Sequence, residues 1–132
     1  MTQTIISDPA NLAEVRHSIE DFSQQCGFTT EAVGEIGLVV NEAIANIIRH
    51  AYGNATDRPI KLTADYSGDT LRIVLRDWGS GRDPSNCCGN DNPLKPGGVG
   101  LSCLRKLMDD VRFEPQPDGM ELTLIRKNTA SA

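Results

Sequence analysis

The hydrophobic residues between positions 33 and 47 recur with the spacing of one helix face. They are Val33, Ile36, Val39, Val40, Ala43, Ile44 and Ile47. A period of 3.6 residues gathers them into one stripe, which predicts an amphipathic helix with that stripe buried. Thr29 or Thr30 can cap its N-terminus, and Gly53-Asn54 is a typical end. We therefore predict that a helix running to about Tyr52 forms the centre of the fold.

The hydrophobic pattern changes to the alternation of β-strands in other parts of the chain. We predict strands at 4–7, 60–66, 71–75, 111–114 and 120–126, and further helices at 12–26 and 101–108. Strands and helices do not alternate regularly in this order. The fold class predicted is α+β, a two-layer α/β sandwich whose mostly antiparallel sheet is covered by helices on one face. We expect residues 1–132 to form one domain with a flexible tail at 128–132.

Composition and charge narrow the classes of function. The net charge of −5 argues against nucleic acid as a main partner, because phosphate backbones favour clustered Lys and Arg. No apolar run is long enough for a membrane span, and the N-terminus does not resemble a secretory signal. The four cysteines, Cys26, Cys87, Cys88 and Cys103, form no C-x-x-C pair, so we expect reduced thiols in a cytoplasmic protein and no zinc site.

Two polar residues, Glu42 and Asn46, lie at the edge of the central apolar stripe. They are four residues apart, so they project from the same side of the helix. A partly buried amide requires hydrogen-bond partners, which makes Asn46 a candidate binding residue. The alternative is a solvated glutamate and an asparagine satisfied within the fold.

The segment 77–100 has no hydrophobic period, is rich in glycine and proline, and is too long for a simple turn. Asp77 follows a strand directly and can accept a hydrogen bond from an amino group such as that of adenine. The nearby Gly79 and Gly81 allow a flat ligand to approach the backbone. The alternative is an ordinary polar turn.

At the far end of this segment, the glycines around Val99 precede a predicted helix. Gly97, Gly98, Val99 and Gly100, which open the predicted helix from Leu101, would present backbone N–H groups and a positive helix end to phosphate. The motif lacks the Lys-Ser/Thr of a P-loop, and a flexible hinge is the alternative reading.

The three motifs together resemble the GHKL ATPase superfamily, which includes gyrase, Hsp90, sensor histidine kinases and MutL. Their order is E-x-x-x-N on a helix, D-x-G-x-G after a strand, and G-x-G at a helix start. Within the superfamily, residues 40–53 and 98–111 most resemble the bacterial anti-sigma factor serine kinases. The resemblance covers about residues 5 to 127 and implies an ATP-binding Bergerat fold.

The resemblance implies a role for each matching residue. Asn46 would coordinate Mg²⁺, Glu42 would act as the general base, and Asp77 would bind the adenine of ATP. Residues 82–97 would form a lid over the nucleotide. The remaining nucleotide contacts would come from Arg49, Gly79, Gly81, Lys95, Gly98, Val99, Gly100 and Leu101.

The resemblance also implies partners. The phosphate acceptor would be a STAS-domain anti-anti-sigma protein, the sequestered partner a sigma factor, and the kinase itself a homodimer. The alternatives are an ATP-binding regulatory module of a phosphatase or phosphorelay, a histidine kinase fragment, and a degenerate binder without catalysis.

Some residues depart from the pattern of the family. Arg82 replaces a common apolar residue, and Pro96-Gly97 stand where some of these kinases carry a basic residue. Many members have a threonine on the last strand pair that helps bind adenine. Here Glu121 and Thr123 share a strand face, and an inward-pointing Glu121 would weaken nucleotide binding.

Overall fold

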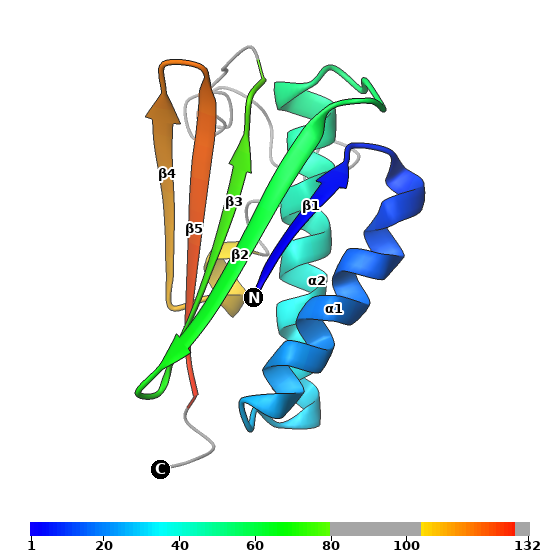
Figure 1. Ribbon diagram of the computed structural model, residues 1–132. Helices are drawn as coiled ribbons and strands as arrows, with labels where there is room; N and C mark the ends of the chain where they lie inside the picture. The colour runs from blue at the N-terminus through cyan, green and yellow to red at the C-terminus, as the bar shows by residue number, and fades with distance from the viewer. Residues whose placement is uncertain (80–103, 129–132) are drawn as a thin grey trace.

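The structure, a computed structural model, describes residues 1–79 and 104–128. Its five strands form one antiparallel sheet in the order β1-β2-β3-β5-β4, with α1 and α2 on one face (Figure 1). The strands are β1 (Thr2–Ile6), β2 (Pro59–Ser67), β3 (Thr70–Asp77), β4 (Asp110–Gln116) and β5 (Gly119–Lys127), and the two long helices are α1 (Leu12–Gln25) and α2 (Thr30–Asn46). A further helical turn at 104–107 falls within the predicted helix at 101–108, whose first three residues lie outside the described part. This architecture confirms the predicted two-layer α+β fold.

The helix boundaries follow from local capping. The Asp8 carboxylate accepts from the Ala10 N–H at 2.9 Å and begins a short 3₁₀ turn, Pro9–Asn11, that leads into α1. Gly27 follows α1 with φ of +92°, a backbone conformation that favours glycine. The Thr29 hydroxyl accepts from the Ala32 N–H at 3.1 Å and caps α2, as the sequence predicted.

The end of the central helix differs from the prediction. The α-helix stops at Asn46, and the chain continues as a π-helix over Ile47–Ala51, in which the Tyr52 N–H donates to the Ile47 carbonyl at 3.1 Å. The wider turn allows both Ile47 and Ile48 to be buried. Short π-helical turns are often found at functional sites.

The core lies between the helices and the inner face of the sheet. The predicted stripe of α2 is buried there, except that Val33 is only partly covered. On β3 the alternation of inward residues runs through Leu71, Ile73 and Leu75 to Asp77. The same alternation that builds the core therefore places a carboxylate on the inner face.

The tail departs from the prediction at its first residue. Asn128 is buried, its N–H donates to the Asp69 carbonyl at 2.6 Å, and its amide donates to the Tyr66 hydroxyl at 3.2 Å. The expectation of a flexible tail is therefore wrong for Asn128, and residues 129–132 lie outside the described part. None of the helices in the described ranges is long and apolar enough to cross a membrane.

Candidate active site

Two of the predicted site residues, Asn46 and Asp77, meet in one pocket. It lies between the end of α2 and the inner faces of β3, β4 and β5. Among the described residues its lining consists of Ala43, Asn46, Ile47, His50, Ala51, Asp77, Leu104, Phe113, Met120 and Leu122. A mostly apolar wall with a few polar groups is typical of sites for small ligands.

Asp77 is the buried acidic group of this pocket. It is 2 % exposed, and its Oδ1 accepts a hydrogen bond from the Gly79 N–H at 3.0 Å. Burial raises the pKa of Asp77, while the backbone N–H of Gly79, the Arg76 guanidinium and the Met120 N–H oppose that shift. A buried carboxylate beside an apolar wall favours a ligand that brings a hydrogen-bond donor, and the amino group of adenine has that chemistry.

Gly79 packs directly against the end of the π-helix. A Cβ at this position would lie 2.4 Å from the Ala51 carbonyl oxygen, so no larger residue fits without movement of the backbone. The first glycine of D-x-G-x-G is therefore required by the contact between β3 and the chain that follows Asn46.

We expect Gly79→Ala to lower the free energy of unfolding by about 1–3 kcal/mol, because the added methyl group overlaps backbone. Urea unfolding followed by circular dichroism measures the change. Gly34→Ala is the control, since a Cβ at Gly34 meets nothing within 4 Å. Equal stability of Gly79→Ala and the parent would contradict the close contact.

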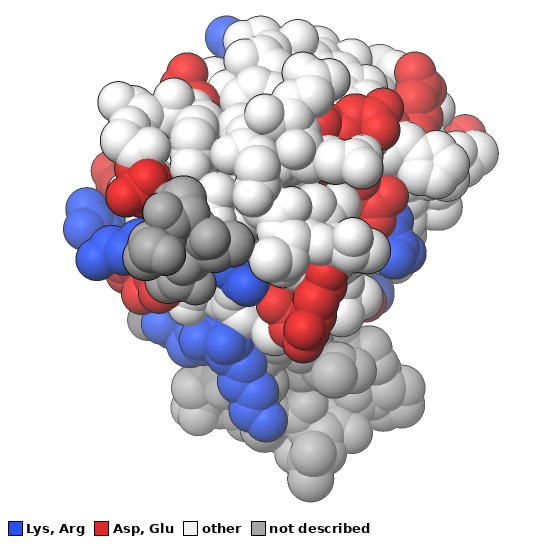
Figure 2. All heavy atoms as spheres, turned by 90° about the horizontal axis from the view of Figure 1, so that it is seen from below, with Lys and Arg blue, Asp and Glu red and all other residues white. Residues whose placement is uncertain are grey.

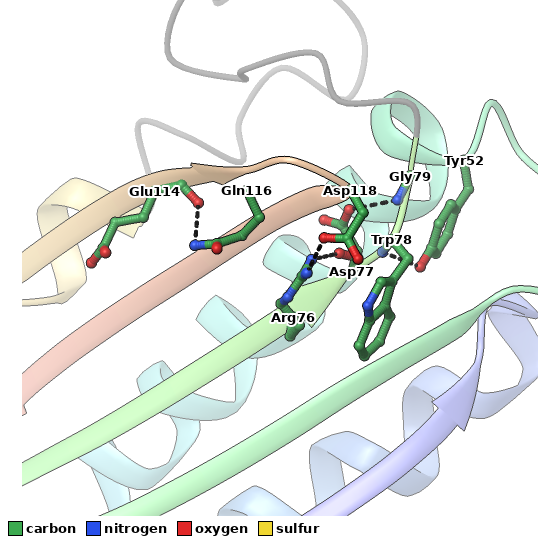
Figure 3. A network of polar contacts seen from close by, with 8 residues as sticks. All are labelled: Tyr52, Arg76, Asp77, Trp78, Gly79, Glu114, Gln116 and Asp118. Atoms are coloured by element: carbon green, nitrogen blue, oxygen red, sulfur yellow. Dashed lines mark hydrogen bonds and ion pairs between the residues drawn. The ribbon is translucent and has the colours of Figure 1, made fainter.

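The Tyr52 hydroxyl joins three segments beside Asp77. It accepts from the Trp78 N–H at 2.9 Å (Figure 3) and also donates to the Pro59 carbonyl. Burial raises the pKa of Tyr52, so the phenol stays protonated and able to donate. Tyr52 thus holds the end of β3 against the end of the central helix. It was not among the predicted site residues, since its role depends on contacts distant in sequence.

Arg76 lies on the opposite face of the sheet, beneath the Asp77 backbone. Its Nη2 lies 2.5 Å from Asp118 Oδ1, and its guanidinium carbon is 4.8 Å from the centre of the Trp78 ring (Figure 3). Gly119 packs against the backbone of Asp77, because a Cβ there would lie 2.0 Å from the Asp77 carbonyl oxygen. These contacts fix the position at which β3 delivers Asp77.

Asn46, the last residue of α2, presents its amide oxygen to a cationic group. Arg49 Nη2 donates to Asn46 Oδ1 at 2.8 Å. Mg²⁺ requires oxygen ligands and usually keeps several waters, so one amide oxygen together with ligand phosphates suits it. Among residues 1–79 and 104–128 no group of three or more His, Cys, Asp or Glu forms a metal cage.

Glu42 lies one helical turn before Asn46 and is half-buried. It is not among the residues that line the described part of the pocket. Its place, on the same side of α2 but outside the apolar wall, suits a group that acts on a second substrate.

Several predicted residues cannot be placed. The expected lid at 82–97, with Arg82, Lys95 and Pro96, lies outside the described residues. So do Gly81, Gly98, Val99, Gly100 and Leu101.

The pairing of β5 with β3 shows which way Glu121 and Thr123 point. Both lie on the face away from the helices, paired in register with Arg76 and Val74, so neither points into the pocket. Met120 and Leu122 line it instead. Met120 and Leu122 were not among the predicted site residues. The alternation along β5 was the available signal, but the sequence did not show which face is inward.

Comparison with known proteins defines the class. Residues 5–126 match the model of the family described as "Histidine kinase-like ATPase domain", and the chain belongs to this family. Membership in this family of ATPase domains implies the use of ATP. The resemblance predicted from the three motifs is thereby confirmed.

Individual relatives extend this result. The chain is 26 % identical to the serine-protein kinase RsbW of Oceanobacillus iheyensis, over 82 % of this chain and 74 % of that protein. It is 23 % identical to RsbW of Bacillus subtilis, over 82 % of this chain and 73 % of the relative.

Solved structures share the fold. The RsbU and RsbW domains of Rv1364c from Mycobacterium tuberculosis match with a TM-score of 0.65 and 17 % identity, covering 96 % of this chain and 32 % of that one. The catalytic domain of histidine kinase ThkA matches with a TM-score of 0.61 and 14 % identity, covering 97 % and 96 %. The chain thus spans about a third of the Mycobacterium tuberculosis structure.

Proposed function

We propose that this protein is an ATP- and Mg²⁺-dependent serine/threonine kinase that acts as an anti-sigma factor in the cytoplasm. Its phosphate acceptor would be a STAS-domain anti-anti-sigma protein, and it would sequester a sigma factor, working as a homodimer. The observation that carries the proposal is the convergence of Asn46 and Asp77 in one largely apolar pocket. The serine-protein kinases among the relatives support the choice of reaction.

In this proposal each of the described residues binds a different part of the nucleotide. Asp77 accepts a hydrogen bond from the adenine amino group, and Met120 and Leu122 cover the apolar base. Asn46 would hold the metal through its amide oxygen, and Arg49, whose Nη2 donates to Asn46 Oδ1 at 2.8 Å, would turn toward phosphate. When bound, Mg²⁺ would neutralise charge on the phosphates. Glu42 takes the proton from the attacking hydroxyl.

Residues outside the described ranges complete the proposed site. Gly98, Val99, Gly100 and Leu101 would offer backbone N–H groups to the phosphates, and Lys95 would add positive charge. Gly81, together with the described Gly79, would flank the adenine.

The test is ATP binding by calorimetry with and without Mg²⁺. We expect the parent protein to bind ATP more tightly with Mg²⁺, and Asn46→Ala to lose that difference because the metal has lost its protein ligand. Asn41→Ala, on the same helix but outside the pocket, is the matched control. An unchanged Mg²⁺ effect in Asn46→Ala would remove this residue from the metal site. Phosphotransfer to STAS proteins of the same genome is the next assay.

The second candidate is an ATP-binding regulatory module of a phosphatase or phosphorelay system, without sigma binding. One comparison favours it, since the Mycobacterium tuberculosis structure contains RsbU and RsbW domains of one protein. Co-purification with a sigma subunit supports the anti-sigma function. A STAS or phosphatase partner without a sigma subunit supports the module.

A further inference from the structure

The negative charge of the chain is concentrated in the helical layer. Together α1 and α2 carry six carboxylates and one arginine, a net charge of −5 that equals that of the whole chain. The rest of the sequence contains twelve acidic and twelve basic residues and is neutral overall. Figure 2 views the molecule from the end where α1 is followed by α2, and shows acidic side chains set among uncharged surface. This layer would attract a positively charged partner.

A groove lies between the two helices at this end. Its lining includes Glu20, Asp21 and Gln24 of α1, Phe28 after it, and Val33 and Gly34 of α2. We call it the α1–α2 groove. Gly34 is twelve residues before Asn46, which is about 18 Å along a helix, so the groove is separate from the nucleotide pocket. It combines a carboxylate edge with an apolar floor.

Gly34 has no explanation among residues 1–79 and 104–128. Glycine in a helix interior is less favourable than alanine. Gly37, one turn later, is explained by α1, because a Cβ there would lie 2.6 Å from Glu20 Oε2. At Gly34 a Cβ would meet nothing within 4 Å, and the backbone is ordinary helix. The glycine leaves bare backbone in the groove, where another molecule can approach closely.

The residues around Gly34 indicate what kind of molecule the α1–α2 groove would bind. Leu38, one turn further along the same face of α2, is 38 % exposed and extends the apolar surface. Glu20 is paired with Arg16 at 3.3 Å, while Asp21 has no ion pair among the described residues. A second copy of this helical layer would be repelled by like charge.

We propose that the α1–α2 groove binds an α-helix of a partner protein whose apolar stripe is bordered by Lys and Arg. The apolar stripe lies on Val33 and Leu38, the bare backbone at Gly34 allows close approach, and the basic residues face Asp21 and Glu20. This is recognition of an amphipathic helix in a groove. It does not depend on the nucleotide site or on the proposed kinase activity.

The test uses a fluorescent leucine–lysine peptide of about 18 residues, five helical turns, with leucines on one face. A peptide of the same composition in scrambled order is the control for charge alone. Two variants of the protein address the groove. Gly34→Gln fills it without changing charge, and Asp21→Lys reverses charge at its edge. Glu14→Lys makes the same charge change on α1 outside the groove.

We expect the helical peptide to bind more tightly than the scrambled one. Gly34→Gln and Asp21→Lys should each weaken it by about tenfold or more, with a smaller effect from Glu14→Lys. Gly34→Gln should not lower the melting temperature, so lost binding cannot be ascribed to unfolding. Equal binding of both peptides, or an unchanged affinity in Gly34→Gln, would overturn the proposal. Calorimetric ATP binding by Gly34→Gln reports separately on the nucleotide site.

Discussion

Glu42→Ala is expected to reduce phosphotransfer by about 10²–10⁴-fold, the usual contribution of a general base, while ATP affinity stays close to that of the parent. The separation of the two effects follows from the structure. Glu42 projects from the same side of α2 as Asn46, but it is not part of the described wall that contains Asp77. Its removal therefore takes away a proton acceptor without opening the adenine pocket.

Two further variants make the Glu42 result specific. Glu42→Gln retains the shape of the side chain and should be as inactive as Glu42→Ala, because an amide does not accept the proton. Glu31→Ala removes a carboxylate from the first turn of the same helix and should keep full activity. Transfer of radioactive phosphate to a STAS protein is the measurement. Activity of Glu42→Ala within a few-fold of the parent would show that another group is the base.

Asp77→Asn is expected to weaken ATP binding by about tenfold to a hundredfold, corresponding to about 1.5–3 kcal/mol for a hydrogen bond to a charged group. The asparagine has one acceptor oxygen, and the Gly79 N–H at 3.0 Å requires it. Its NH₂ group would then face the amino group of adenine, so two donors would meet. Calorimetry measures the affinity, and the one tryptophan, Trp78, provides a fluorescence signal next to the site. Unchanged affinity would remove Asp77 from the adenine site.

The same variant tests the electrostatics of the pocket. Because burial raises the pKa of Asp77 above its ordinary value of 3.8, the native state holds the proton more tightly than the unfolded state. The ionised carboxylate thus costs stability. We expect the unfolding free energy of the parent to fall relative to Asp77→Asn as pH rises from below 3.8 through the raised pKa, and then to stay level. A difference independent of pH would contradict a raised pKa.

The local elements of this protein could be predicted because each depends on neighbouring residues. The buried stripe of α2 can be predicted from helical spacing alone, and the Thr29 cap from a hydroxyl residue just before the helix. The alternation of apolar and polar residues along β3 predicts the hairpin. When this alternation is continued from Leu75 by two residues, Asp77 lies on the inner face. The meeting of Asn46 and Asp77 required the order of family motifs, since no local pattern joins α2 to β3.

Other features depended on long-range packing and could not be predicted. The π-helix over Ile47–Ala51 was not predicted, because its residues continue the apolar pattern of an α-helix. The Tyr52 hydroxyl has partners on β2 and after β3, and the inward face of β5 is set by its pairing with β3. Each of these depends on strand order, which hydrophobic periodicity does not encode.

The position of β5 between β3 and β4 has a consequence for synthesis of the protein on the ribosome. Met120 and Leu122, which line the pocket, belong to β5, which follows the other four strands of this sheet in the chain, yet β5 pairs with β3 from the middle of the chain. Until it emerges, β3 has an open edge and Asp77 lacks the wall beside it. A growing chain therefore cannot complete this pocket, the proposed site of ATP, until the hairpin of β4 and β5 has inserted into the sheet.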